Sequence, residues 1–177
     1  MTELPTPAGR RAAEAAAAGA ALAAAAFLVR GYDFGGNGYH AQFLPRLLSL
    51  LDPDLYVGDG YVAALNLLPT PFWDLLAGVC RWSGASPEAV CAAGFALASW
   101  ATWSVVYLLA RTLAGSRSGA WLGCGLALLN PYLNAHSLLA SDTFLRRHLD
   151  ATSFCLPAAL AGLWAWLSGW PVAAGAV

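Results

Sequence analysis

Long blocks of apolar residues alternate with shorter polar stretches along the chain. Four of these blocks approach the roughly 20 apolar residues that a helix needs to cross a bilayer. They cover residues 12–29, 88–110, 119–140 and 152–170. The second block has a well-marked start, because Ser86 suits an N-cap and Pro87 and Glu88 suit a first helical turn. The pattern predicts an all-α fold, a polytopic membrane helix bundle with about four transmembrane helices.

The stretch between the first two blocks, residues 31–85, is far longer than the usual connection of about five residues. Its first half contains "HAQFLPRLLSLL" (residues 40–51), in which apolar residues recur at helical spacing. The apolar side would hold Phe43, Leu44, Leu47, Leu48 and Leu51, and the opposite side Gln42, Arg46 and Ser49. Because this segment is too short to span a bilayer, we expect an amphipathic helix lying in the membrane interface.

The second half of the same loop predicts another short amphipathic helix, "PFWDLLAGVCRW" (residues 71–82). Its apolar face would consist of Phe72, Leu75, Leu76 and Val79. Two tryptophans, Trp73 and Trp82, are expected at the boundary between lipid and water, where such rings are enriched. The loop should therefore hold two interfacial amphipathic helices.

Composition supports a membrane location. The chain has 177 residues, of which 59% are hydrophobic and 11% charged, whereas an ordinary soluble domain carries about 25% charged residues. The net charge of −1 and the lack of a basic patch exclude a nucleic-acid partner. We expect a multi-pass protein of the inner (plasma) membrane, a single membrane domain over residues 1–177, with the lipid bilayer as its main partner.

Arginine placement predicts the orientation, because arginines are enriched in cytoplasmic loops. Arg10 and Arg11 precede the first block, and Arg111 and Arg117 lie between the second and third blocks. Both places should be cytoplasmic, which puts the N-terminus inside and residues 31–85 and 141–151 outside. Arg146 and Arg147 depart from this rule in the second outer loop and hint at a local function. A cleaved signal peptide over residues 1–26 is the competing interpretation of the first block.

Two residues at the start of the outer loop are candidates for chemistry. Asp33 follows the first block closely and precedes the flexible run "GGNG", so it would hold a carboxylate at the membrane surface beside an adaptable backbone. His40 opens the first amphipathic helix nearby and could bind an anion or hold a proton. The alternatives are a solvated turn aspartate and a structural histidine.

The middle of the loop, "LDPDLYVGDGY", adds three more carboxylates. Asp52 and Asp54 are two residues apart and could together chelate a divalent cation, which prefers oxygen ligands. Asp52 followed by Pro53 is also typical of a helix N-cap. Asp59 could contact a substrate, or it could be a turn residue before Gly60.

Two segments of the chain resemble a known kind of membrane protein. "GYDFGGNGYHAQFLPRLLSLLDPDLYVGD" and "FLRRHLDATSFCLPAALAGLWAWLSGWPVAAGA" are similar to an uncharacterised bacterial membrane family that is related to glycosyltransferases of the GT-C fold. The resemblance covers roughly residues 12–177. It implies transfer of a sugar from a polyprenyl-phosphate donor on the extracytoplasmic side. Members of that family are several times longer, so the chain would be the amino-terminal portion of such a protein.

The resemblance also implies roles for individual residues. Asp33 stands where GT-C enzymes commonly place their essential aspartate, and Arg146 or Arg147 would face the lipid phosphate. The usual acidic pair near the first helix is absent, because Phe34 follows Asp33. As a hypothesis, Asp33 would take a proton from the acceptor hydroxyl. A cation held by Asp52, Asp54 or Asp59 would stabilise the charge that develops on the phosphate.

A non-enzymatic multi-pass protein, such as a transporter part or a scaffold, is the alternative function. Asn130-Pro131 interrupts the third block, and a proline break inside a bilayer is tolerated where the backbone faces protein or a water-filled cavity. Ion-coupled transport would need charged residues in the centres of the helices. The second, third and fourth blocks have none there.

Overall fold

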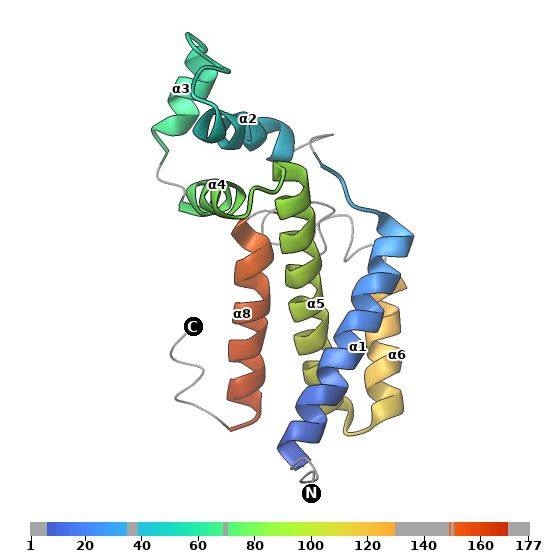
Figure 1. Ribbon diagram of the computed structural model, residues 1–177. Coiled ribbons are helices and arrows are strands. Elements are labelled where there is room, and N and C mark those ends of the chain that lie inside the picture. Colours follow the sequence, from blue (N-terminus) through green and yellow to red (C-terminus); the bar gives the residue numbers. More distant parts are fainter. Residues whose placement is uncertain (1–6, 35–38, 69–70, 130–148, 150, 170–177) are drawn as a thin grey trace, which may run out of the picture. The chain divides into compact units, whose positions relative to one another are not determined.

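The computed structural model describes residues 7–34, 39–68, 71–129, 149 and 151–169 (Figure 1). Within these residues the chain is all-helical, with seven helices and no strand, which confirms the all-α part of the predicted fold class. The helices are α1 (Pro7–Arg30), α2 (Tyr39–Leu51), α3 (Gly60–Asn66), α4 (Pro71–Ser83), α5 (Pro87–Ala114), α6 (Arg117–Leu129) and α8 (Ala151–Leu167).

Among the described residues, two single helices are long and apolar enough to cross a membrane, and the bent pair of α3 and α4 would be a third span if it crosses as one. The two single helices are the 21-residue stretch Gly9–Val29 of α1 and the 28-residue helix α5. Both coincide with predicted blocks, and they indicate a membrane protein. α8 is apolar but has only 17 residues. α6 begins at the predicted third block, whose second half, with Asn130-Pro131, lies outside the described residues.

Local signals in the sequence explain where the long helices begin and end. The Ser86 hydroxyl oxygen accepts the backbone N–H of Ala89 at 3.2 Å, which confirms Ser86 as the N-cap of α5. At the other end, Gly115 has a φ of 65° and donates its N–H to the Arg111 carbonyl at 3.2 Å. Gly31 ends α1 in the same way, with a φ of 75° and a bond of 2.7 Å to Phe27. Glycine tolerates this left-handed conformation, so it stops each helix.

The chain divides into two compact units, which we describe separately. The first contains α1, most of α5, α6 and α8, and the second contains residues 32–95, with α2, α3, α4 and the start of α5. In the first unit, α1 and α6 lie side by side (Figure 1). Its core combines small residues of α1 and α6 with two large rings of α5; the members are Ala15, Ala18, Leu22, Trp103, Tyr107, Ala120 and Cys124.

Close helix approach in the first unit depends on Gly19. A Cβ atom added at this position would lie 2.8 Å from the backbone nitrogen of Ser104 and 2.9 Å from its Cα. The indole of Trp100 donates a hydrogen bond of 2.9 Å to the Ala16 carbonyl at the same crossing. Small residues let membrane helices pack backbone to backbone in this way.

The second unit packs α2 against both α3 and α4. Leu47 of α2 is fully buried, and the ring of Phe43 stacks on Trp73 of α4 with centroids 6.2 Å apart. Both amphipathic helices were predicted with nearly their observed bounds. α3 was not predicted, because its seven residues are too few to show a helical period.

The predicted faces of these two helices need correction. Arg46 is buried, with 4% of its surface exposed, rather than on an outer polar side of α2. On α4, Leu75 and Val79 are exposed, as the predicted lipid-facing side requires, whereas Trp73 and Leu76 are buried within the unit. The face of α4 that points inward consists of Trp73, Leu76, Ala77 and Cys80. This set has the same helical spacing as the predicted one, so periodicity alone could not choose between them.

Candidate functional site

Asp33 belongs to residues 31–34, the short segment after α1 that we call the junction. It is half-buried and comes two residues after Gly31, the residue that ends α1. The ring of Tyr32 packs on Phe95 of α5, with centroids 4.9 Å apart. This contact holds the residue directly before Asp33 against α5.

The Tyr32 hydroxyl shares this junction. Its oxygen is buried and has no hydrogen-bond partner among the described residues. Burial raises the pKa of Tyr32 well above its usual range, and nearby Cys91, Glu88 and Asp33 add to the rise. The phenol therefore stays protonated at neutral pH and is a donor without an acceptor beside Asp33. Sequence reasoning missed Tyr32, although its position next to Asp33 was a usable signal.

His40 belongs to the first turn of α2. Its side chain lies outside the described part of the structure, so its predicted role with Asp33 stays a prediction. The same holds for Arg146 and Arg147, which fall in residues 130–148, outside the described residues.

Asp52 and Asp54 lie in an exposed turn directly after α2. Asp52 continues the helix by one bond, from its N–H to the Leu48 carbonyl at 2.8 Å, and its Oδ1 accepts the N–H of Asp54 at 3.1 Å. No helix begins at Pro53, so the interpretation of Asp52 as an N-cap is wrong. Among the described residues, no three His, Cys, Asp or Glu side chains gather as metal ligands. A cation at Asp52 and Asp54 stays a prediction.

Asp59 is the N-cap of α3. Its Oδ1 accepts the backbone N–H groups of Tyr61 at 2.8 Å and Val62 at 3.1 Å. Two free N–H groups at the start of a helix need such an acceptor, which gives Asp59 a structural role. Its second oxygen, Oδ2, makes no hydrogen bond with any described residue and is available to a ligand.

Asp59 also borders a cavity of about 330 Å³ in the second unit. Ser49, Tyr56 and Asn66 line the same cavity, and the Asn66 amide lies 3.4 Å from the Ser49 hydroxyl oxygen. A carboxylate, an amide and two hydroxyl groups thus meet around one hollow. These groups can donate to and accept from the hydroxyls of a sugar ring.

Neither a protein-family model, nor a curated protein, nor a solved structure matches this chain. The cavity around Asp59 and the junction around Asp33 lie in the same compact unit. Of the predicted site residues, Asp33 is half-buried and Asp59 borders a cavity. Asp52 and Asp54 are turn residues by their contacts.

Proposed function

We propose that the chain is the amino-terminal portion of a GT-C-like glycosyltransferase, which transfers a sugar from a polyprenyl-phosphate donor on the extracytoplasmic side of the inner membrane. In this proposal α6 and α8 begin two further spans, four in all, and the N-terminus is cytoplasmic. One observation carries the proposal. The long loop after the first span folds into a compact unit with a polar cavity at Asp59 and a half-buried Asp33 near its start.

The exposed apolar side chains of the second unit support a place at the bilayer surface. Leu75 and Trp82 of α4 are 65% and 89% exposed, while the other face of that helix is buried against its unit. Such a surface is stable where lipid covers it. A donor lipid could then keep its chain in the bilayer while its sugar enters the cavity.

In this proposal each residue has its own role. Asp59, Asn66 and Tyr56 bind sugar hydroxyls, and Asp33 takes the proton from the acceptor as the bond to phosphate breaks. The protonated Tyr32 supplies a hydrogen bond beside Asp33. Arg146 or Arg147 neutralises the phosphate that leaves; Asp52 and Asp54 would hold a divalent cation if one takes part, and it would supply the same positive charge.

The alternative, a transporter part or scaffold, has less support. Between Glu88 and Arg111 the span α5 has no acidic or basic residue, and α1 has none between Glu14 and Arg30. Ion-coupled transporters place such residues within their spans.

The test uses the intact protein in proteoliposomes supplied with polyprenyl phosphates that carry different radiolabelled sugars. We expect Asp33→Asn to lower the rate of sugar transfer at least about a hundredfold, because a general base is lost. Glu88→Gln is the matched control, since this exposed carboxylate of the same unit has no proposed role, and it should leave the rate within about twofold. Undiminished transfer by Asp33→Asn would reject the base assignment. Uptake of labelled sugar without any transfer would favour the transporter.

A further inference from the structure

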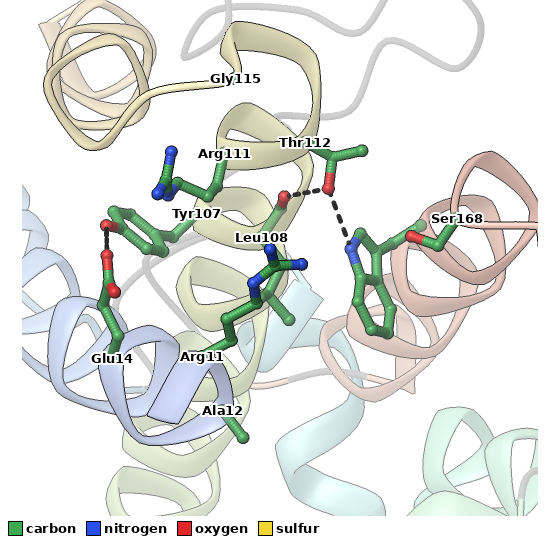
Figure 2. Close-up of a pocket in the computed structure, with 10 residues that line it drawn as sticks. Arg11, Ala12, Glu14, Tyr107, Leu108, Arg111, Thr112, Gly115 and Ser168 are labelled. Carbon is green, nitrogen blue, oxygen red and sulfur yellow. Dashed lines mark hydrogen bonds between the residues drawn. The ribbon is translucent and has the colours of Figure 1, made fainter. Parts of the chain in front are cut away.

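A second cavity, of about 760 Å³, lies at one end of the first unit (Figure 2). It is formed by residues of α1, α5 and α8, all within that unit. Arg11 of α1 and Arg111 of α5 both line it, and Figure 2 shows Arg11 extending from α1 toward α5. Arg11 lies near the start of one candidate membrane span and Arg111 near the end of the other. The cavity therefore lies where both spans would leave the bilayer.

Positive charge in this cavity is only partly neutralised. Glu14 is its acidic lining residue, and that carboxylate already accepts hydrogen bonds from the Tyr107 hydroxyl at 2.5 Å and from Arg117 at 2.8 Å. Neither Arg11 nor Arg111 makes an ion pair with a carboxylate of the described residues. With Glu14 committed to Arg117, two guanidinium groups remain for an outside anion.

The rest of the lining is mainly apolar and well anchored. The Trp164 indole of α8 donates to the Thr112 hydroxyl at 3.2 Å, and Thr112 in turn donates to the Leu108 carbonyl at 2.9 Å (Figure 2). Tyr107 closes the opposite wall and is itself buried. A wide cavity with two cations and aromatic walls suits an anion that carries an apolar body, more than a small hydrated ion.

We propose that this cavity binds a phosphate group through Arg11 and Arg111, and that the group belongs to the head of an anionic phospholipid whose chains run along Leu108 and Trp164. The site lies in the first unit and requires no catalysis, so it does not depend on the proposed function. A soluble phosphate would offer the two arginines the same chemistry without using the apolar walls. The two sources are separated by experiment.

The experiment measures ligand binding to the full chain in detergent micelles by native mass spectrometry. The probes are phosphatidylglycerol, phosphatidylcholine and inorganic phosphate, each titrated separately. We expect phosphatidylglycerol to bind most tightly, and Arg11→Gln or Arg111→Gln to weaken it about tenfold each, since each removes a charge-assisted hydrogen bond. Arg10→Gln is the matched control: it removes the same charge from the neighbouring residue, which does not line the cavity, and should change the affinity less than about twofold.

A steric variant keeps the test decisive if an arginine variant does not fold. Ala12 lines the cavity and is exposed on α1, so Ala12→Trp fills the space and leaves every charge in place. It should also weaken phosphatidylglycerol binding about tenfold. Inorganic phosphate binding that needs both arginines, without preference for phosphatidylglycerol, would support the phosphate site and assign it to a soluble ligand. Equal losses of phosphatidylglycerol affinity in Arg10→Gln and Arg11→Gln would overturn the proposal. So would a failure of both phosphatidylglycerol and inorganic phosphate to bind.

Discussion

The two compact units place their charged groups in opposite ways. In the first unit Arg11, Glu14, Arg111 and Arg117 gather at one end, and the interior is built from small residues and two large rings. In the second unit an arginine, Arg46, lies in the interior. Long helices satisfy their own backbone along most of their length, so the first unit needs no charged group inside; its buried polar residue among those described is the neutral Thr102. Short helices expose many terminal carbonyls relative to their size, and something must bind them.

In the second unit, Arg46 binds such carbonyls at the end of a helix. One of its terminal nitrogens, Nη1, donates to the carbonyls of Leu65 at 2.9 Å and Leu68 at 2.5 Å, both at the carboxyl end of α3. The other, Nη2, lies 3.4 Å from the carboxylate of Asp74 on α4. A single side chain thereby ties three helices together. Arg81 does the same on a smaller scale, because it donates to the Leu50 carbonyl at the end of α2.

We expect the largest loss of stability from removing the contacts of Arg46 in the interior of the second unit. Arg46→Met keeps the volume of the side chain and removes its donors. The Leu65 carbonyl then keeps only the Leu68 N–H at 3.1 Å, the Leu68 carbonyl loses its bond to Arg46, and Asp74 loses its ion-pair partner. We expect the free energy of unfolding to fall by about 3 kcal/mol. The measurement is denaturant unfolding in detergent micelles, with amide hydrogen exchange to show that α3 and α4 open while α1 and α6 stay protected.

Arg81→Met is the control for that experiment. Arg81 is exposed, so water can replace its bond to the Leu50 carbonyl, and the loss should stay below about 1 kcal/mol. Equal losses for the two variants would mean that burial of Arg46 is not what stabilises the second unit. Faster exchange in all helices after Arg46→Met would show that the two units unfold together.

A second prediction concerns the close crossing of α1 and α5 at Gly19 in the first unit. In Gly19→Ala the added Cβ would approach the backbone of Ser104 below 3 Å, so the two helices must separate. The expected loss is about 2 kcal/mol by the same unfolding measurement. Ser104→Ala should not rescue this variant, because the backbone nitrogen and Cα of residue 104 remain.

Gly125→Ala provides the comparison for Gly19→Ala. No atom of the described residues lies within 4 Å of a Cβ added at Gly125 on α6, and alanine is the better helix former. The variant should be neutral or more stable by up to about 1 kcal/mol. If Gly19→Ala behaved like Gly125→Ala, the close crossing of α1 and α5 would not contribute to stability.

Local features of the fold were predictable from the sequence, and long-range ones were not. The N-cap at Ser86 and the bounds of α1, α4 and α5 follow from residues within a few positions of each helix end. The burial of Arg46 depends on carbonyls about 20 residues away, and no local pattern reports such a partner. The inward face of α4 depends on Phe43 and Leu47 of α2, because they pack where Trp73 lies.

The same contrast between local and long-range features applies to the candidate sites. Asp33 and Asp59 were chosen as candidates because glycines follow each of them closely in the sequence. The cavity around Arg11 and Arg111 was not predicted, although the bias of arginines toward one side had already grouped them. Its walls come from three helices that are far apart in the sequence, and Trp164 closes it from a position 153 residues after Arg11.

The smallest expected effect separates structure from function at Asp59. Asp59→Ala removes the N-cap of α3 and should cost about 1 kcal/mol, whereas Asp59→Asn keeps an oxygen that can cap and should cost less than about 0.3 kcal/mol. Ser116→Ala at the start of α6 is the matched cap variant in the first unit, since the Ser116 hydroxyl oxygen accepts the N–H of Gly119 at 3.1 Å. Because α3 has only seven residues, hydrogen exchange should speed up along all of it in Asp59→Ala, but only in the first turn of α6 in Ser116→Ala. The asparagine variant then decides the role of the charge. If it folds as the parent does and yet loses sugar transfer, the carboxylate serves the ligand; if transfer persists, Asp59 serves only the helix, and the polar cavity beside it binds without a charge.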